Sequence, residues 1–420
     1  MSHDADVEGR VHDICSRARR AARLLSAVDT AAKNEALRLA AEGLRAGRAV
    51  LLEANGRDVA AAAKASLAFR DRLTLNPERI EAMAEGINQV AVLPDPVGES
   101  IAAWRRPNGL EIHQVRIPIG VIGIIYESRP NVTADAAALC LKSGNATILK
   151  GGSEALHTNS AIAEIFASAV ERAGLPQSCV ELIRTTDRAA TRALLRQKDL
   201  VDVIVPRGGK ELIRALEEES EIPVIKHLEG VCQLYVDRDA DLDRAGRICI
   251  NAKVSRPGVC NAIENLLVHR EVAEAFVPRI VRALQAENVE IRGCAETRRL
   301  VPGVKAAVEE DWGTEYLDKV LSVKIVASLE DALEFIERYG SGLADAIVTE
   351  SYTAARRFLS AVDSAAVFVN ASTRFTDGFE FGFGGEIGIS TNRLHARGPM
   401  GLRELTTYKY LVYGSGQVRE

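Results

Sequence analysis

The sequence predicts an α/β protein built around a parallel β-sheet, because apolar strand candidates alternate with helical stretches from Pro118 onward. The four strand candidates are residues 121–126, 146–149, 180–183 and 202–205, and a helix-forming stretch follows each of them. Repeated strand–helix units of this kind build parallel sheets that helices cover on both faces. Such sheets bind ligands at the carboxyl ends of their strands.

The 420-residue chain is long enough for two or three domains, at roughly 100–200 residues per domain. The first hundred residues are predicted to be helical, since residues 31–57 and 59–71 are rich in Ala, Leu, Arg and Glu. The segment 93–96, Leu-Pro-Asp-Pro, breaks this pattern. A second α/β region follows from about residue 233 to 370, and its strand candidates are 261–269, 323–326 and 346–349.

Two further segments predict a small β element. Residues 110–117 alternate apolar and polar side chains, which indicates a half-exposed strand. Residues 406–413 are aromatic and β-prone. We expect them to pair with the strand near residue 113, within one chain or across subunits.

The composition argues against several classes of protein. The formal net charge is -5, whereas a dedicated nucleic-acid binder usually carries a basic face. No apolar run reaches about 18 residues, so no membrane span is expected, and the polar N-terminus lacks the apolar core of a secretion signal. The seven cysteines include no CxxC pair, so we expect reduced thiols in a cytoplasm, with neither a metal site nor disulfides.

Three strand-to-helix turns in the first α/β region carry residues suited to an anionic ligand. Asn131 follows the turn after residues 121–126, where its amide could face a developing oxyanion or simply cap the helix. Two glycines follow Lys150, and Gly208 and Gly209 follow the strand at 202–205. Glycine-bearing turns before helices favour a nucleotide site, although the GxGxxG fingerprint of the ordinary Rossmann fold is absent.

Cys260 is the candidate nucleophile among the cysteines. It follows the turn Pro257–Gly258, and Lys253 and Arg256 lie nearby in the sequence. A positive field would lower the pKa of its thiol and raise the thiolate fraction. The alternative is a small buried apolar residue, which is the ordinary role of a free cysteine.

Residues 381–388 and 395–401 form a glycine-rich stretch with six glycines, which cannot stabilise a helix or a central strand. One interpretation is a loop whose backbone approaches a ligand, and the other is a solvated surface loop. Arg393, Arg397 and Arg403 are candidates for holding a carboxylate or phosphate group.

Four motifs together carry a family resemblance. They are Tyr-Glu-Ser-Arg-Pro-Asn-Val-Thr at 126–133, Arg-Pro-Gly-Val-Cys-Asn at 256–261, Gly-Gly-Glu-Ile-Gly-Ile-Ser-Thr at 384–391 and Leu-His-Ala-Arg-Gly-Pro-Met-Gly at 394–401. In this order they closely resemble the γ-glutamyl phosphate reductases, a family of the aldehyde dehydrogenase superfamily. The resemblance extends from about residue 15 to residue 415.

This resemblance implies an aldehyde-dehydrogenase-like α/β fold with three parts. A parallel-sheet NADP(H)-binding domain would comprise residues 1–104 and 118–230, and an α/β catalytic domain residues 231–400. Residues 105–117 and 401–420 would form a small β oligomerisation element, so a homo-oligomer is expected.

The resemblance also implies roles for single residues. Cys260 matches the nucleophile of the superfamily, and Asn131 matches the asparagine that binds the oxyanion together with the backbone N–H of Cys260. Lys150 matches the lysine that holds the adenosine ribose, and Glu315 resembles the glutamate that holds the nicotinamide ribose. The implied cofactor-binding set is Lys150, Gly208, Gly209 and Glu315, and the implied substrate-binding set is Arg129, Arg256, Glu229 and Arg397.

Glu229 lies 31 positions before Cys260, close to the usual place of the general base in the superfamily. Water would hydrolyse a thioester intermediate, so we expect Glu229 to have a structural or substrate-contacting role instead. One departure from the family pattern is Leu343, where members often carry His. The role of that position is therefore in doubt.

The activity implied is the NADPH-dependent reduction of L-glutamyl 5-phosphate to L-glutamate 5-semialdehyde, with release of phosphate, through a cysteine thioester in proline biosynthesis. Glutamate 5-kinase is a candidate protein partner. Ser153, three places after Lys150, leaves room for the 2′-phosphate of NADPH, although Glu154 is adjacent. The alternatives are an NAD-dependent aldehyde dehydrogenase for another substrate and a non-catalytic homologue.

Overall fold

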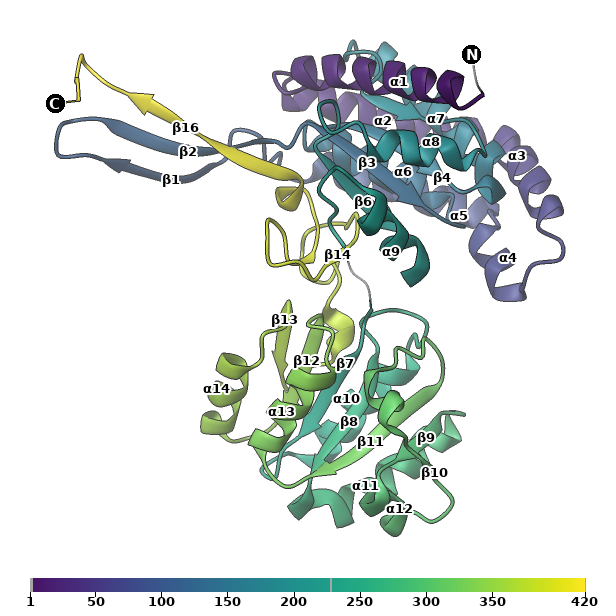
Figure 1. Cartoon of the computed structure of the whole chain (residues 1–420), viewed down its shortest axis with the longest axis vertical. Coiled ribbons are helices and arrows are strands. Elements are labelled where there is room, and N and C mark those ends of the chain that lie inside the picture. The colour runs from purple at the N-terminus through teal and green to yellow at the C-terminus, as the bar shows by residue number, and fades with distance from the viewer. Residues whose placement is uncertain (1–2, 227–228, 420) are drawn as a thin grey trace. The chain divides into compact units, whose positions relative to one another are not determined.

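A computed structural model describes residues 3–226 and 229–419 of the chain, which divides into two compact units (Figure 1). Unit 1 comprises Met1–Lys226, Gly382–Gly388 and Met400–Glu420, and unit 2 comprises His227–Phe381 and Ile389–Pro399. No helix in the described ranges combines the length and the apolarity that a membrane crossing requires.

Most of residues 3–92 are helical, as the sequence predicts. The helices are α1 His3–Leu25, α2 Thr30–Ala46, α3 Arg48–Ala61, α4 Leu67–Leu73 and α5 Pro77–Val92. The single helix expected over 31–57 is instead divided at Gly47, which ends α2 and precedes α3. A Cβ atom on Gly43 would lie 2.6 Å from Ile165 Cγ2, and one on Gly47 would lie 2.9 Å from the Gly43 carbonyl oxygen. Both glycines therefore let this corner approach the rest of the unit closely.

The four predicted strands form the parallel sheet of unit 1, with the order β5-β4-β3-β6. The strands are β3 Val121–Tyr126, β4 Ala146–Gly151, β5 Val180–Leu182 and β6 Val203–Arg207. The helical elements that follow them are α6 Asn131–Lys142, η1 Ser153–Ala155, α7 Leu156–Arg172, α8 Arg188–Leu195 and α9 Lys210–Glu219. Every residue of β3 and β4 is buried, which is typical of a parallel sheet covered on both faces.

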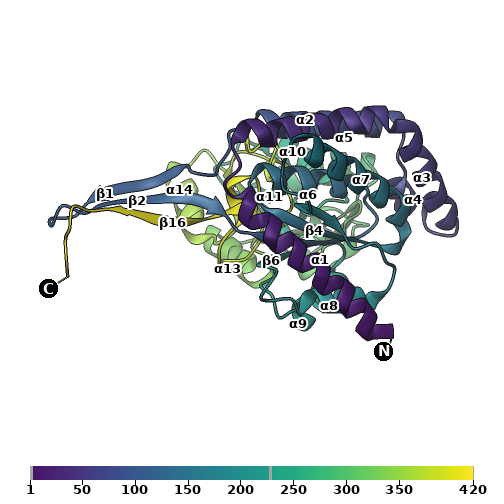
Figure 2. The same cartoon turned by 90° about the horizontal axis from the view of Figure 1, so that it is seen from above.

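A second, antiparallel sheet of unit 1 has the order β1-β2-β16. Its strands are β1 Ser100–Arg105, β2 Glu111–Pro118 and β16 Thr406–Tyr413, and Figures 1 and 2 both show them as a narrow arm extending from the rest of the unit. The predicted pairing of residues 406–413 with the strand near 113 is confirmed within one chain. The predicted β element began at residue 105 and missed β1, because all six of its residues are exposed and give no alternating pattern.

Unit 2 contains a parallel sheet with the order β10-β9-β11-β8-β7-β12-β13. Its strands are β7 Cys232–Val236, β8 Ile263–His269, β9 Glu290–Gly293, β10 Lys305–Ala306, β11 Val320–Val326, β12 Ala344–Val348 and β13 Ala366–Val369. Its helical elements are α10 Leu242–Val254, α11 Arg270–Ala286, α12 Ala295–Leu300, η2 Glu309–Gly313, α13 Leu329–Tyr339, α14 Tyr352–Ala361 and η3 Thr373–Phe375. The predicted strands at 261–269, 323–326 and 346–349 correspond to β8, β11 and β12.

Part of the glycine-rich stretch belongs to unit 1 and part to unit 2. Residues 382–388, which we expected within a catalytic domain over 231–400, instead belong to unit 1. The backbone N–H of Ile387 donates to the Met400 carbonyl at 2.9 Å, and a Cβ atom on Gly384 would lie 2.6 Å from Leu93 Cδ1. The remaining elements are β14 Ile389–Ser390 and β15 Gly398–Pro399, which pair antiparallel, and η4 Arg403–Leu405.

Candidate active site

The carboxyl ends of β4, β3 and β6 bring three of the predicted segments to one edge of the unit 1 sheet. Tyr126, the last residue of β3, is in register with Gly151 of β4 and with Arg207 of β6. The turns that follow these strands, at 127–130, 152–155 and 208–209, therefore start side by side. This is the edge at which a doubly covered parallel sheet binds its ligand.

Two of these turns are held by carboxylates from this same edge. Glu127 Oε2 accepts the backbone N–H of Gly209 at 3.2 Å. Glu154 Oε1 accepts the backbone N–H of Ser128 at 2.6 Å and its hydroxyl at 3.2 Å. Ser128 has a φ of 49, a left-handed conformation that is uncommon for a non-glycine residue and occurs often at functional sites.

The nucleotide-binding candidates of unit 1 differ in their surroundings. A Cβ atom on Gly208 would lie 2.5 Å from Leu212 Cδ2, so the Leu212 side chain would have to move to admit one, whereas nothing lies within 4 Å of such an atom on Gly209. Gly209, the N-cap residue of α9, has no side chain to cap the helix, and its backbone N–H is bonded to Glu127 Oε2. Lys150 is buried, with Nζ 3.0 Å from the Gly151 carbonyl, and burial lowers the pKa of its ammonium group.

Asn131 is the first residue of α6, and its side chain is exposed. Its Nδ2 donates to Asp135 Oδ2 at 2.9 Å, one helical turn further along. Pro130 occupies the N-cap position, and no side-chain hydrogen bond from the described residues caps this helix. The structure therefore rules out the helix-capping interpretation of Asn131.

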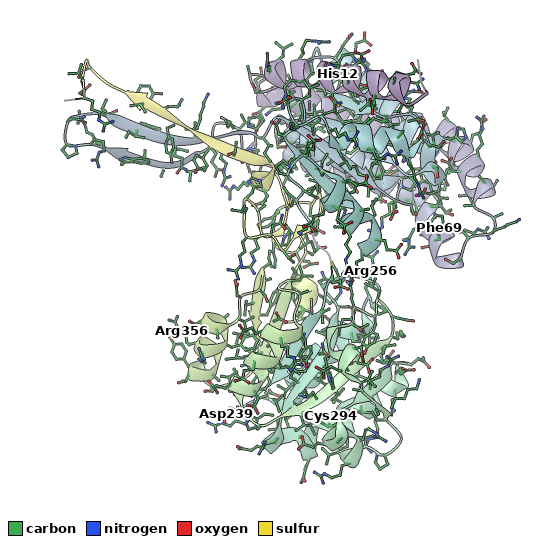
Figure 3. All side chains as sticks on the ribbon, in the orientation of Figure 1. His12, Phe69, Asp239, Arg256, Cys294 and Arg356 are labelled. Atoms are coloured by element: carbon green, nitrogen blue, oxygen red, sulfur yellow. The ribbon has the colours of Figure 1, made fainter. Side chains whose placement is uncertain are left out.

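In unit 2, the predicted site residues precede three neighbouring strands. Gly230 lies just before β7, Cys260 before β8 and Glu315 before β11, and the order β11-β8-β7 places these strands side by side. Figure 3 shows Arg256 at one end of this unit, and Asp239 and Cys294, which follow β7 and β9, at the opposite end. The predicted site residues of unit 2 thus lie at the amino ends of its strands, whereas those of unit 1 lie at the carboxyl ends.

The backbone around Cys260 makes close contacts with both neighbouring segments. A Cβ atom on Gly230 would lie 2.6 Å from Cys260 Cα, so only glycine lets the segment after Glu229 approach this closely. A Cβ atom on Gly258 would lie 3.5 Å from the carbonyl oxygen of Leu317, in the loop that carries Glu315. The structure therefore brings together, within unit 2, the backbone segments that contain Glu229, Cys260 and Glu315.

The positive groups near Cys260 differ from those we expected. Lys253 is fully buried and its Nζ lies 2.6 Å from Glu264 Oε2, so its charge is already neutralised. Arg256 is exposed, as a ligand-binding arginine would be. Arg374 interacts with both Arg256 and Cys260. Burial and the charge of Arg256 lower the pKa of the Arg374 guanidinium, and the charge of Cys260 raises that pKa. Arg374 was missed because it lies far from Cys260 in the sequence, in no motif.

The loop that carries Glu315 is anchored by buried polar groups. The hydroxyl of Tyr316 lies 2.9 Å from Asp311 Oδ1 and 2.8 Å from Ser322 Oγ, and Arg292 Nη1 donates to Asp311 at 2.5 Å. Leu317 has a φ of 53, and its N–H lies 3.4 Å from Glu264 Oε1. Burial raises the pKa of Glu264 to about 7, against the opposing effect of Lys253.

A row of polar residues continues this anchor across the sheet. Asp345, Gln233, Asn265, Ser322 and Arg292 stand in register on five neighbouring strands. Asp345 accepts the backbone N–H of Gln233 at 2.9 Å, and burial raises the pKa of its carboxyl group to about 7. In β7 the row passes through Gln233, the second residue of the strand. It therefore lies next to the loops that precede the strands and carry the predicted site residues.

Two predictions for unit 2 remain. Arg397, a predicted substrate-binding residue, is paired with a carboxylate, and Leu343, the departure from the family pattern, is buried. Arg397 donates to Asp363 Oδ1 and to the Asp363 carbonyl, each at 2.6 Å, and this pairing keeps the pKa of Asp363 below its ordinary value. Arg393 also bonds Asp363. Leu343 is fully buried in the core of unit 2, just before β12. An apolar side chain is therefore compatible with that position.

Comparisons with known proteins show which family the chain belongs to. A family model for the aldehyde dehydrogenase family matches residues 2–297. A protein from Moorella thermoacetica named gamma-glutamyl phosphate reductase is 56% identical over 406 residues, which cover 96% of this chain and 97% of that protein. The protein of the same name from Carboxydothermus hydrogenoformans is 54% identical, with 97% of this chain and 99% of that protein covered.

Solved structures of known proteins share the fold of this chain. The crystal structure of gamma-glutamyl phosphate reductase from Thermotoga maritima matches with a TM-score of 0.96 at 47% identity, covering 98% of this chain and 100% of that chain. An acetylating aldehyde dehydrogenase from Geobacillus thermoglucosidasius shares the fold, with a TM-score of 0.69 at 19% identity over 100% of this chain and 99% of that chain. The chain belongs to the γ-glutamyl phosphate reductase family, within the aldehyde dehydrogenases.

Proposed function

We propose that this chain reduces L-glutamyl 5-phosphate to L-glutamate 5-semialdehyde and releases phosphate, as a step of proline biosynthesis. The names of relatives that are 54–56% identical over nearly the whole chain support this substrate. The observation that carries the proposal is the surroundings of Cys260. Its backbone lies close to Gly230, which follows Glu229, and Gly258, two residues before it, lies close to the loop of Glu315; the charge of Cys260 also interacts with that of Arg374. A cationic environment of this kind stabilises a thiolate.

Membership of a dehydrogenase family implies a nicotinamide cofactor, which supplies a hydride when bound. We propose NADPH. Ser153 is too small to oppose a 2′-phosphate, and the neighbouring carboxylate of Glu154 is already bonded to Ser128. Lys150, Gly208 and Gly209 of unit 1 would hold the adenosine and phosphate groups. Glu315 of unit 2 would hold the nicotinamide ribose.

In the first half of the proposed reaction, the thiolate of Cys260 attacks the acyl carbon of the substrate. The amide of Asn131 and the backbone N–H of Cys260 would stabilise the tetrahedral oxyanion. The bond from the acyl carbon to the phosphate oxygen then breaks, phosphate leaves with the electron pair, and a thioester remains on Cys260. This proposal requires Asn131 and Cys260 to meet the same acyl group.

In the second half, hydride reaches the acyl carbon and the same donors stabilise the new oxyanion. Collapse of this thiohemiacetal breaks the carbon–sulfur bond, which releases the aldehyde and restores the thiolate of Cys260. Dividing the reaction at the thioester replaces one difficult step by two easier ones. Glu229 would contact the substrate and take no part in activating water, since water would destroy the thioester.

Two exposed arginines, Arg129 and Arg256, are the best placed of the proposed substrate-binding residues to meet the phosphate and carboxylate groups. Arg397 would have to leave Asp363 before it met the substrate. We further propose a cytoplasmic homo-oligomer that takes its unstable substrate from glutamate 5-kinase.

The test couples the purified chain to a glutamate 5-kinase that makes the acyl phosphate in place. Oxidation of NADPH that depends on the kinase, ATP and glutamate is the expected result, with NADH as the comparison cofactor. The reverse reaction, aldehyde with NADP⁺, should require phosphate. Phosphate-independent oxidation would instead indicate a hydrolysing aldehyde dehydrogenase. Absence of turnover with authentic acyl phosphate would indicate a non-catalytic homologue.

A further inference from the structure

We propose that Asp135 is a positioning residue, whose carboxylate holds the amide of Asn131 in the orientation that oxyanion binding needs. The proposal rests on the proposed function, in which Asn131 supplies a hydrogen bond to the oxyanion. It is carried by one contact within unit 1, from Asn131 Nδ2 to Asp135 Oδ2 at 2.9 Å.

The start of helix α6 is held in place, but the amide of Asn131 is not. That side chain therefore needs a partner to orient it. Thr133 Oγ1 lies 2.6 Å from the hydroxyl of buried Tyr126 and donates to Asn159 Oδ1 at 2.9 Å. The backbone at the start of α6 is therefore anchored on β3 and on α7. The final torsion of an asparagine side chain is broad, however, and an exposed amide such as that of Asn131 can turn over.

A carboxylate removes this freedom because it can only accept hydrogen bonds. With Asp135 ionised, Nδ2 must face the carboxylate, since the reverse orientation would set Oδ1 against a negative charge. One N–H of the Asn131 amide is then used by Asp135. The second N–H is directed elsewhere and stays available for a substrate oxygen.

Protonation of Asp135 would release this control. A neutral carboxylic acid can also donate, so it could bond Oδ1 of Asn131 and accept the reversed amide. Asp135 is half-buried, and burial raises the pKa of its carboxyl group to about 6. The hydrogen bond from Asn131 and the charge of Arg207, at the end of β6, both act in the opposite direction. The orientation of the amide should therefore weaken as the pH falls through about 6.

The test is Asp135→Asn, which keeps the shape of the side chain but can both donate and accept. With the coupled assay above pH 7, we expect kcat to fall roughly tenfold, part of the hundred- to thousand-fold cost of losing a whole oxyanion donor. The KM for NADPH should stay unchanged. The ratio of wild-type to variant kcat should shrink towards one as the pH falls below about 6.

Ser143→Ala, at the C-cap of the same helix, is the matched control, because it removes the buried hydrogen bonds from Ser143 Oγ to the Leu139 and Cys140 carbonyls and the one from Asn145 Nδ2 without touching Asn131. It should lower the melting temperature and leave kcat and its pH profile unchanged. If Asp135→Asn does not fold, Asn131→Ala gives the second measurement. The ratio of wild-type to Asn131→Ala kcat should narrow over the same pH range.

The outcomes separate this proposal from the proposed function. An inactive wild-type chain would defeat the function itself. The positioning role would be overturned by a second outcome. In it, the wild type is active and Asn131→Ala is impaired, but Asp135→Asn keeps the kcat and pH profile of the wild type. A kcat ratio that stays constant with pH in the folded variants would overturn it as well.

Discussion

The exposed amide of Asn131 makes oxyanion binding testable at the scale of a single residue. Asn131→Ala should lower kcat by roughly a hundred- to thousand-fold, because a donor aimed at the oxyanion acts mainly in the transition state. The KM for NADPH and the melting temperature should change little, since the side chain neither caps α6 nor is buried. Steady-state kinetics and a melting curve measure both effects. A variant that turns over normally once folded would show that the oxyanion has another donor.

Asp345 gives a pH test of stability. Burial raises the pKa of its carboxyl group to about 7 in the folded chain, well above the ordinary value of 3.8. At pH values between these two pKa values, the folded state keeps a proton on Asp345 that the unfolded state has lost. The contribution of the protonated carboxyl group to the free energy of unfolding is therefore present at low pH and disappears as the pH rises through about 7. Asp345→Asn does not titrate. The free energy of unfolding of the wild type minus that of the variant should fall by about 1 kcal/mol per pH unit between pH 5 and 7.

Chemical denaturation of both proteins at several pH values measures this difference. Asp199→Asn, at an exposed position, serves as the control and should show no such trend relative to the wild type. A constant difference between the wild type and Asp345→Asn would mean that the carboxyl group of Asp345 is already ionised in the folded chain at pH 5.

The sequence alone proposes a single residue where a motif contains both the residue and its surroundings, and the roles of Cys260 and Asn131 stay predictions. The turn with Pro257 and Gly258 identifies Cys260, and the strand-to-helix turn identifies Asn131. Asp135 follows Asn131 at the spacing of one helical turn, a signal in the sequence that our motif boundary at Thr133 left out. Arg374 could not be found in this way, because tertiary structure alone brings it near Cys260.

At the scale of elements, the loop from 314 to 319 is held in place by the hydroxyl of Tyr316. Tyr316→Phe keeps the ring but removes the bonds to Asp311 and Ser322, at 2.9 and 2.8 Å. Leaving such groups unpaired costs roughly 1–3 kcal/mol. We expect a lower melting temperature and a raised KM for NADPH, because the displaced loop carries Glu315.

Tyr339→Phe is the matched control, because the hydroxyl of Tyr339 bonds the exposed carboxylate of Glu309 at the surface of the same unit. It should change neither the melting temperature nor the KM for NADPH appreciably. If Tyr316→Phe lowers stability but leaves every kinetic constant unchanged, the loop has no part in cofactor binding.

Elements were predictable where burial gives the sequence a strong pattern. The strands β3 and β4 are buried along their whole length, and their apolar runs identify them. β1 is exposed along its whole length, so its sequence Ser-Ile-Ala-Ala-Trp-Arg carries no such signal. The amino-end position of the site in unit 2 was also out of reach, because the rule for parallel sheets predicts the opposite edge.

At the scale of the whole molecule, the sheet β1-β2-β16 leaves a long exposed edge strand, β16, with aromatic side chains on it. The ring of Tyr410 contacts those of Trp104 and Tyr408, and its side chain is 53% exposed. Exposed edges of this kind pair with other chains. We expect Tyr410→Lys to shift the chain towards smaller species in analytical ultracentrifugation.

Tyr352→Lys, at an exposed tyrosine of α14, is the control and should leave the assembly unchanged. A wild-type chain that sediments as a monomer would contradict the oligomerisation role of this sheet. Equal assembly of the wild type and Tyr410→Lys would show that the contact between subunits lies elsewhere.

The sequence changes near residue 230 from one set of strand–helix units to the next, and the two compact units divide near the same place. The return of residues 382–388 to unit 1 was not predictable, because it depends on long-range contacts such as that of Gly384 with Leu93. A glycine-rich stretch has too few side chains to indicate which unit it joins.

The most direct test of the central claim is to trap the thioester on Cys260. The chain is incubated with glutamate 5-kinase, ATP and glutamate without NADPH, then digested and analysed by mass spectrometry. The expected result is one glutamyl group on the peptide that contains Cys260. It should disappear when NADPH is added and should be absent in a folded Cys260→Ala variant that has lost turnover. Turnover retained by Cys260→Ala, or a glutamyl group on a different residue, would contradict the account.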